Sequence, residues 1–423
     1  MSDYIIVNGH GPDSLTPSDV GPKAFRLIEL GMWSRAASTF QVPAFAMVPA
    51  QLSLEYYSRF GAPRQQDYGP IAEPSLISSE VKRFFDGFYD MNAATFDRCL
   101  SYLSGPRAIY IGSSLALATA TRISFAGVNS RTTPNSVPRT SSYVKVAVEN
   151  ALSGLFRAYA QLYLKGHGLA VETRPASIMF YEFIEAEYEA VAYVHGGRVH
   201  VEWKPLKGQT RSLVPPTQFD LWGKNAWGGY WNVDSRGERV CSALRDVLSL
   251  AHSRDDDIAE FEFCFTENDD LFILQYRSYP ARFPSPSGAE KEEKVPILGT
   301  VGRVVGRPLS LVNREVSLAA ASWIVDMQSE DASILPIWIV NRHGSGWDAF
   351  RLLWAADYAN IGPIRLVMCH THDFYPLHLT SVLREDPRVN FFGELELARI
   401  QPWLSGDRLE LEGDGLNVWG ALR

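Results

Sequence analysis

The sequence lacks the features of a membrane-spanning, secreted or disulfide-stabilised protein. Only four cysteines occur among 423 residues, and they lie far apart, at Cys99, Cys241, Cys264 and Cys369. Such sparse cysteines do not form a disulfide framework, so we expect reduced thiols in a cytoplasmic protein. No apolar run approaches the roughly 18 residues needed to cross a bilayer. The opening MSDYIIVNGHGPD has neither the basic start nor the apolar core of a secretory signal.

Nucleic-acid binding and two common kinds of enzyme site are also disfavoured. The formal charge is −8 at pH 7, and the chain contains no block of lysine and arginine. It contains no Walker A motif for a P-loop nucleotide site and no G-x-S-x-G elbow for a hydrolase serine. The hydrophobic fraction of 46% is ample for packed cores, and the length suits two or three domains.

A stretch rich in proline, small residues and charge divides the chain. ARFPSPSGAEKEEKVP, residues 281–296, has little to bury and is typical of an exposed linker. We therefore expect an N-terminal domain over residues 1–280, built as one or two lobes, and a C-terminal domain over residues 297–423.

Helical and strand patterns alternate in the N-terminal part, which indicates an α+β or α/β fold. Apolar periodicity predicts two helices, over residues 22–33 with a stop at Gly31 and over residues 141–168. Alternation predicts two single strands and two hairpins, at residues 108–114, 176–184, 190–203 and 261–277. The hairpins are expected to turn at Gly196-Gly197 and Asn268-Asp269-Asp270.

The C-terminal part reads as a small β-α-β unit followed by a hairpin. IRLVMCH (364–370) is a buried-strand pattern, HLTSVLRED (378–386) a short helix and RVNFFG (388–393) a second strand. GDRLELEGDGLNVWG, residues 406–420, is typical of a hairpin with a Gly-Asp turn.

Three N-terminal segments carry polar residues at distinctive places. Lys23 precedes a helix in VGPKAFRLIEL, Ser113 and Ser114 lie in IYIGSSLALATATRISFAG, and FEFCFTENDDLFILQYRSYPAR contains Glu262, Gln275 and Arg277. Together these segments resemble the nucleotide-binding domain of the pyruvate phosphate dikinase and phosphoenolpyruvate synthase family. Strand alternation alone places Gln275 and Arg277 on one face of their hairpin.

A fourth segment resembles the phosphohistidine domain of the same family. Counted from His378, Arg384 stands at +6, Glu385 at +7 and Gly393 at +15, as in the family's pattern around its phosphorylated histidine. The resemblance thus implies an ATP-grasp-like N-terminal part followed by a small swivelling β/β/α phosphohistidine-like domain.

The resemblance also implies an activity and its residues. ATP and Mg²⁺ are the expected cofactors, with Lys23, Ser113 and Arg277 on the nucleotide and Glu262 and Gln275 on Mg²⁺. The catalytic pair is then Arg277 and His378, and His378 passes a phosphoryl group to a small-molecule acceptor, as a phosphotransferase or an ATP-driven ligase does.

The acceptor either binds to this chain or sits on a partner protein. Three tryptophans cluster in FDLWGKNAWGGYW, at positions 222, 227 and 231. They suit an apolar or aromatic acceptor, and they also suit ordinary packing. Neither nucleic acid nor a membrane is an expected partner.

Several positions depart from the family's pattern. Gly112 stands where the family has a phosphate-binding arginine, Ala118 and Thr119 replace a Glu-Asp pair, and Tyr181 replaces a glutamine. Tyr159 and Leu164 take the places of a pair of arginines in a later helix of the family. A second hypothesis follows, in which the chain is a catalytically incomplete descendant that binds a nucleotide or ligand as a partner subunit.

Two further histidines lie close to His378. Cys369-His370-x-His372 does not have the spacing of the usual structural zinc sites. His370 and His372 are therefore more simply interpreted as strand-end and loop residues, with zinc as the alternative.

Overall fold

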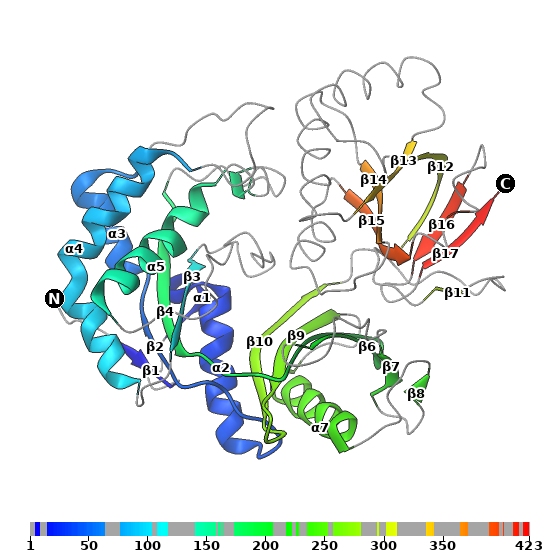
Figure 1. The fold of residues 1–423 in the computed structure, drawn as a ribbon, viewed down its shortest axis with the longest axis horizontal. Helices are drawn as coiled ribbons and strands as arrows, with labels where there is room; N and C mark the ends of the chain where they lie inside the picture. Colours follow the sequence, from blue (N-terminus) through cyan, green and yellow to red (C-terminus); the bar gives the residue numbers. More distant parts are fainter. Residues whose placement is uncertain are drawn as a thin grey trace.

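Among the residues that it describes, the structure, a computed structural model, has three β-sheets (Figure 1). It describes residues 5–8, 15–63, 77–103, 108–116, 140–157, 160–161, 164, 173–205, 217–221, 226–227, 235–252, 257–280, 294–295, 302–310, 336–341, 364–370, 389–396, 401, 409–413 and 418–422.

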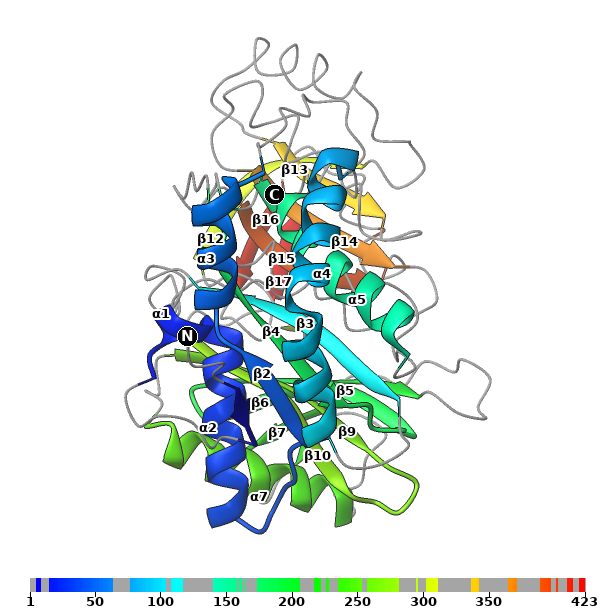
Figure 2. The ribbon, with the colours of Figure 1, turned by 90° about the vertical axis from the view of Figure 1, so that its left-hand side faces the viewer.

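The first sheet has four antiparallel strands in the order β1-β2-β4-β3. They are β1 (Ile6–Val7), β2 (Phe45–Val48), β3 (Ile109–Leu115) and β4 (Ala176–Glu182). One face packs against α3 (Gln51–Phe60), α4 (Ser79–Tyr102) and α5 (Ser141–Ser153) (Figure 2). The other face packs against α1 (Pro17–Val20) and α2 (Pro22–Ala36).

Strand alternation explains why both faces of this sheet are apolar. On β4, Ile178 and Phe180 belong to the core under α4, and Met179 belongs to the core under α2. Helix α4 begins where Ser78 accepts a hydrogen bond from the Val81 N–H at 3.2 Å, an ordinary N-cap. The predicted strands 108–114 and 176–184 are confirmed as β3 and β4.

The second sheet has six antiparallel strands in the order β10-β9-β5-β6-β7-β8. They are β5 (Tyr188–His195), β6 (Arg198–Pro205), β7 (Thr217–Asp220), β8 (Ala226–Trp227), β9 (Asp257–Phe265) and β10 (Leu271–Pro280). One face packs on α7 (Ser235–Leu250). Both predicted hairpins are confirmed, and Gly196 and Gly197 make the first turn with φ of +55° and +74°.

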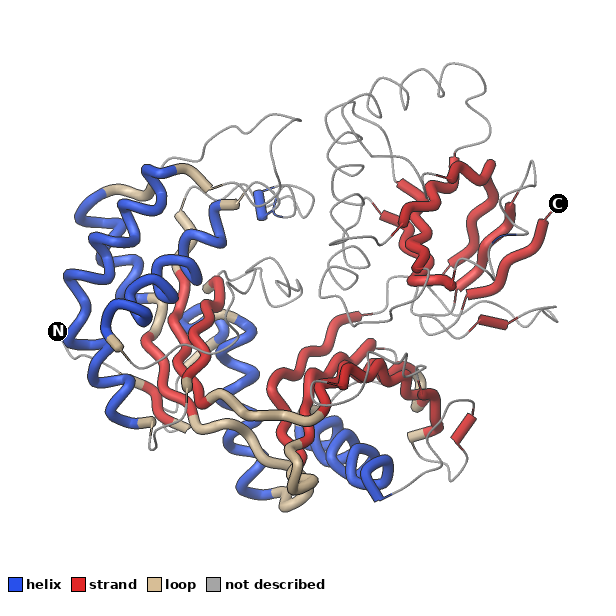
Figure 3. The backbone as a smooth tube through the Cα atoms, viewed as in Figure 1, coloured by secondary structure: helices blue, strands red, loops and turns tan. Residues whose placement is uncertain are grey.

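Helix α2 packs against both of these sheets. Leu27 and Ile28 belong to the core of the first sheet, Leu30 belongs to that of the second, and Trp33 meets the ring of Tyr276 edge-on at 6.0 Å. The chain after α2 also hydrogen-bonds to β10 through Gln41, whose N–H donates to Leu271 O at 2.8 Å. Figure 3 shows the connecting loops running between the two sheets.

Two helix boundaries differ from those expected from sequence. The predicted stop at Gly31 is wrong, because α2 continues to Ala36. A Cβ at Gly31 would lie 3.1 Å from the ring of Phe45, so this glycine allows close helix–sheet packing rather than ending the helix. The predicted helix 141–168 is interrupted, since α5 ends at Ser153 and the 3₁₀ turn η2 (Gly154–Phe156) follows.

The third sheet lies wholly within residues 294–422 and has the order β11-β17-β16-β12-β13-β14-β15. Its strands are β11 (Lys294–Val295), β12 (Gly302–Ser310), β13 (Pro336–Asn341), β14 (Ile364–His370), β15 (Val389–Glu396), β16 (Leu409–Gly413) and β17 (Val418–Leu422).

Both strand predictions for the C-terminal part are confirmed. β14 and β15 pair in parallel, as a β-α-β unit requires, and β16 and β17 form the expected antiparallel hairpin. The predicted helix 378–386 lies outside the described residues. Lys294 and Val295, which the sequence places in the linker, pair with β17. Within the described ranges, no helix has the length and apolar character needed to span a membrane.

Candidate functional site

Polar side chains gather on the face of the second sheet that is turned away from α7. On β9, Phe261 and Phe263 point into the core, so the alternating Glu260 and Glu262 point to the opposite face. Glu262 lies directly across from Gln275 of β10, and Glu260 lies across from Arg277. Glu260 is 2% exposed, and Glu262 and Gln275 are each 8% exposed. The two strands therefore place two buried carboxylates, a buried amide and a mostly buried guanidinium side by side.

A β-bulge decides which face Gln275 and Arg277 take. Leu271 and Ile273 point into the apolar core, and simple alternation would send Gln275 and Arg277 there too. The pairing shifts by one residue between Ile273 and Gln275, so that Tyr276 enters the core instead. The predicted common face of Gln275 and Arg277 is confirmed, but the bulge that makes it polar was not predicted.

Arg277 forms an ion pair with Glu260, which the sequence did not single out as a site residue. The guanidinium Nη2 donates to Glu260 Oε1, and the side chain of Arg277 is only 13% exposed. A guanidinium has five N–H donors in a planar fork, so pairing with one carboxylate oxygen does not by itself prevent a phosphate contact. Glu260 thus fixes the position of the Arg277 guanidinium.

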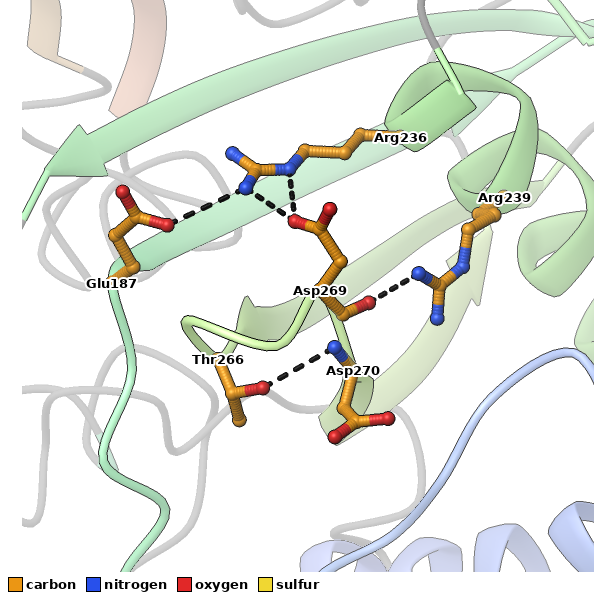
Figure 4. Close-up of polar contacts among 6 residues, drawn as sticks. All are labelled: Glu187, Arg236, Arg239, Thr266, Asp269 and Asp270. Atoms are coloured by element: carbon orange, nitrogen blue, oxygen red, sulfur yellow. Dashed lines mark hydrogen bonds and ion pairs between the residues drawn. The ribbon is translucent and has the colours of Figure 1, made fainter.

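The hairpin that carries these residues is held against α7 by two arginines (Figure 4). Arg236 Nε donates to Asp269 Oδ1 at 2.5 Å, its Nη2 reaches Glu187 at 3.4 Å, and Arg239 donates to the carbonyl oxygen of Asp269. Burial lowers the pKa of Arg236, but Asp269 and Glu187 raise it more, so it stays above its ordinary value. This clamp fixes the turn between β9 and β10, and with it the pairing of Glu262 with Gln275.

Lys23 lies at the second position of α2, in a segment fixed by serine hydroxyls. Ser114 Oγ accepts a hydrogen bond from the Ala24 N–H at 3.1 Å, and Ser177 Oγ donates to Val20 O at 2.5 Å. Gly21 has φ +82°, and a Cβ there would lie 2.3 Å from Ser114 Oγ. The N-terminal end of α2 is therefore packed directly on β3.

Ser113, predicted to contact the nucleotide, points to the other face of β3. Its hydroxyl donates to Ala151 O of α5 at 2.6 Å, and the residue is 3% exposed. The structure thus gives Ser113 a contact that anchors α5, while its neighbour Ser114 lies beside Lys23. The cofactor role of Ser113 stays a prediction.

The structure brings three of the predicted site residues together and leaves the others apart. Glu262, Gln275 and Arg277 share one face of the second sheet, whereas Lys23 and Ser113 belong to the first. His378 and the tryptophans at 222 and 231 lie outside the described residues.

At two positions of the first sheet where the resembled family has phosphate-binding side chains, this chain has an aromatic residue and a glycine. Tyr181, in place of a glutamine, stacks on Tyr110 with ring centroids 4.6 Å apart and an angle of 27° between the planes. Gly112, in place of an arginine, leaves no side chain, and a Cβ there would lie 3.1 Å from the Tyr110 ring. Tyr110 and Tyr181 are half-buried, so this part of the first sheet presents an aromatic surface.

The side-chain oxygens on this face that could hold a metal ion belong to Glu262 and Gln275. Among the described residues no group of three or more His, Cys, Asp or Glu side chains could hold a metal ion alone. A carboxylate and an amide oxygen are nevertheless the hard ligands that Mg²⁺ accepts when substrate phosphates complete its shell. The donor set fits a phosphate-bound Mg²⁺ better than a metal held by protein alone.

Comparison with known proteins gives no family assignment from sequence. No family model matches the chain, and no curated protein matches significantly. Solved structures give weak similarities over 61–63% of this chain, with 8–10% identity and TM-scores of 0.26–0.28. They are an ADP complex of N5-carboxyaminoimidazole ribonucleotide synthetase, D-alanyl-alanine synthetase A from Vibrio cholerae O1 biovar eltor, and VanG D-Ala:D-Ser ligase from Enterococcus faecalis.

The matched regions span 45–60% of the length of those three structures. Likeness at this level does not transfer an activity, so the chemistry has to follow from the side chains of the two N-terminal sheets.

Proposed function

We propose that this chain is an ATP-dependent enzyme whose N-terminal part binds nucleotide in the ATP-grasp manner, with the phosphates on the polar face of β9 and β10. The observation that carries the proposal is the row of buried polar groups there, Glu262 opposite Gln275 and Glu260 opposite Arg277. Burying charged groups costs several kcal/mol per ion unless each is compensated. A charged ligand and its cation would compensate these buried charges.

The residues present fit Mg²⁺ and phosphate. Glu262 and Gln275 offer two oxygens to the ion, and the guanidinium of Arg277 matches the geometry of phosphate oxygens. When bound, Mg²⁺ neutralises charge on the phosphates and so favours phosphoryl transfer. Lys23, at the start of α2, is the second cation proposed for the phosphates.

The finer proposal concerns the destination of the phosphoryl group. We infer from the resemblance that His378 accepts it and hands it to a small acceptor, apolar or aromatic in character or carried by a partner protein. Neutral imidazole is nucleophilic near pH 7, and a phosphohistidine can donate the group again. The C-terminal sheet, confined to residues 294–422, is the part that would move between donor and acceptor.

The nucleotide site is tested by thermal unfolding of the full chain with ATP and MgCl₂. Ligand binding to the folded state raises the melting temperature of the wild type. Glu262→Gln should weaken Mg²⁺-dependent ATP binding about 10–100-fold, since it replaces one charged oxygen ligand. Glu267→Gln, an exposed carboxylate in the turn of the same hairpin, is the matched control. A wild type with no shift for any nucleotide overturns the proposal.

The transfer step is tested with ATP labelled separately at the β and γ positions. Acid-labile label should appear on the wild type and on His372→Ala but not on His378→Ala, because the first two keep the proposed nucleophile. Label that persists in His378→Ala would show that another residue is phosphorylated.

A second function, nucleotide binding without transfer, is favoured by one observation. Gly112 and Tyr181, which stacks on Tyr110, stand where the resembled family holds phosphates with polar groups. If the chain only binds nucleotide, ATP raises the melting temperature and Glu262→Gln reduces that rise, but no label from ATP appears on the protein. The two measurements together therefore separate an enzyme from a binding subunit.

A further inference from the structure

Helix α2 turns one stripe of side chains toward the second sheet. Arg26, Leu30 and Trp33 follow one another at spacings of four and three residues, so they lie on one side of the helix. Leu30 belongs to the apolar core of the second sheet, and Trp33 packs against that core. Lys23 precedes Arg26 by three residues and therefore lies on the same side of α2. The stripe that faces the second sheet thus begins with the lysine proposed for the phosphates.

Tyr276 of β10 meets this stripe from the side of the sheet. Its ring lies edge-on to Trp33 with the centroids 6.0 Å apart, and the guanidinium carbon of Arg26 lies 5.5 Å from the centre of the ring. A cation within about 6 Å of a ring face is attracted to it. Glu29 Oε2 accepts a hydrogen bond from Arg26 Nη1 at 2.6 Å, so the guanidinium is held in place from a second side.

This contact lies directly after the irregular point of β10. In the pairing of β9 with β10, no residue of β9 stands opposite Leu274, because the register shifts between Ile273 and Gln275. Such a bulge disrupts the ladder locally, so the strand beyond it needs another anchor. Tyr276 is 1% exposed and supplies that anchor in the core. The residues on either side of it, Gln275 and Arg277, are the ones whose placement depends on it.

The chain that follows α2 holds β10 on the other side of the bulge. Gln41 N–H donates to Leu271 O at 2.8 Å, and Gln41 O accepts from the Ile273 N–H at 2.9 Å. Helix α2 and the segment after it therefore hold β10 both before and after the bulge. The two polar residues beyond the bulge are thereby kept in place relative to α2, and hence to Lys23.

We propose that Arg26 and Tyr276 are positioning residues of the nucleotide site, through which α2 aligns Lys23 with Gln275 and Arg277. The inference rests on the nucleotide site proposed above and adds how its two halves, carried by different sheets, are aligned. When only a fraction of the molecules has the binding-competent arrangement, the apparent affinity falls by that fraction. Loss of the contact between Arg26 and the Tyr276 ring should therefore weaken ATP binding, although Tyr276 itself is turned into the core.

The first measurement is the dissociation constant of ATP in MgCl₂, by titration calorimetry of the full chain. Arg26→Met removes the cation above the ring and should weaken ATP binding about two- to fivefold, as expected for one partly exposed cation–π contact. Arg26→Lys keeps a cation there and should retain most of the affinity. Arg59→Met is the matched control, because Arg59 of α3 lies 5.1 Å from the centre of the Phe60 ring, and it should bind ATP as the wild type does.

The second measurement needs no nucleotide. It follows the hydrogen exchange of the backbone amides of residues 271–280, which form β10. These amides should exchange about two- to fivefold faster in Arg26→Met than in the wild type, because the strand beyond the bulge has lost one of its holds. Arg59→Met should leave this exchange unchanged. Should Arg26→Met fail to fold, Arg26→Gln takes its place, since it keeps an N–H donor for Glu29 but puts no charge above the ring.

Faster exchange of β10 together with weaker ATP binding in Arg26→Met supports the positioning role. A lower melting temperature with unchanged exchange and unchanged ATP binding shows a merely structural contact and overturns that role. Weaker ATP binding with unchanged exchange also overturns it, because Arg26 then acts on the nucleotide through its charge alone. If the wild type binds no nucleotide, faster exchange in Arg26→Met still shows that α2 holds β10, and the error then lies in the proposed function.

Discussion

Two ion-pair groups in this chain differ sharply in burial, and so in what they contribute. The side chains of Glu260 and Arg277 are almost completely buried. Lys145 of α5 contacts Asp86 and Asp90 of α4 at 2.9 and 2.8 Å, and this group is exposed to solvent. A buried pair adds little net stability when made, but it is costly to break, because the remaining charge is stranded. An exposed pair is screened by water and salt.

Replacing Glu260 by alanine should lower the free energy of unfolding by about 3 kcal/mol, since it strands Arg277. The double variant Glu260→Ala/Arg277→Met should recover part of the loss. Lys145→Ala, which opens the exposed group, should change stability too little to measure. Urea unfolding of the three variants checks this prediction. An effect of Glu260→Ala as small as that of Lys145→Ala would show that the pair is solvated.

Burial also changes the pKa values of two cysteine thiols. It raises the pKa of Cys99 and of Cys264 from 9.0 to about 12. The folded state therefore holds these protons at pH values where the unfolded chain has lost them. Stability should be unaffected below pH 9 and should fall between pH 9 and 12, by up to about 1.4 kcal/mol per pH unit for each thiol.

Urea unfolding at several pH values, with Cys99→Ala for comparison, isolates the share of Cys99 from other groups that titrate in this range. The variant should show a smaller decline above pH 9. Neither Cys99 nor Cys264 should react with a thiol reagent at pH 8 unless the protein is unfolded. Rapid modification of Cys99 in the folded protein would contradict the predicted shift.

At the scale of elements, local sequence patterns predicted the strands and hairpins. Contacts between elements distant in the sequence determine details such as the role of a glycine within a helix. The glycines at 196 and 197 signal a turn in any context, so the first hairpin could be predicted. Gly31 looks like the same kind of signal but serves packing against Phe45, which only the folded sheet reveals.

The candidate site, too, could be predicted only in part from local sequence patterns. The shared face of Gln275 and Arg277 follows from their spacing of two residues. The pairing of Arg277 with Glu260 depends on the register of β9 and β10, and that register includes a bulge which no local pattern announces.

Two helix-boundary glycines offer a matched test of how tightly the start of α2 is packed. Gly21 and Gly61 have nearly the same backbone conformation, with φ/ψ of +82°/154° and +77°/161°. Alanine at Gly61 meets no atom within 4 Å and should cost about 1–3 kcal/mol for the conformation alone.

Alanine at Gly21 has the same conformational cost and also meets Ser114 Oγ at 2.3 Å and Leu115 O at 2.7 Å. Gly21→Ala should therefore be clearly the more destabilising of the two in urea unfolding, and it should weaken any ligand contact made by Lys23. Equal costs would mean that the start of α2 can shift away from β3.

At the scale of the whole molecule, the contacts between sheets are uneven. The first two sheets share α2 and are also joined by the hydrogen bonds of Gln41 to β10. All strands of the third sheet come from residues 294–422, and its strands pair only among themselves in the described part of the chain. The first two sheets are therefore expected to unfold together, and the third separately.

A fragment of residues 1–280 tests this division. It keeps every strand of the first two sheets together with α2 and α7, so it should fold and give one cooperative transition in circular dichroism. A fragment of residues 1–250 is the matched control. It loses β9 and β10, and β9 lies between β10 and β5, so much of the apolar face over α7 would be removed and this fragment should not fold. If residues 1–280 also fail to fold, the C-terminal sheet is part of the same cooperative unit, and a domain that moves independently to carry a phosphoryl group becomes untenable.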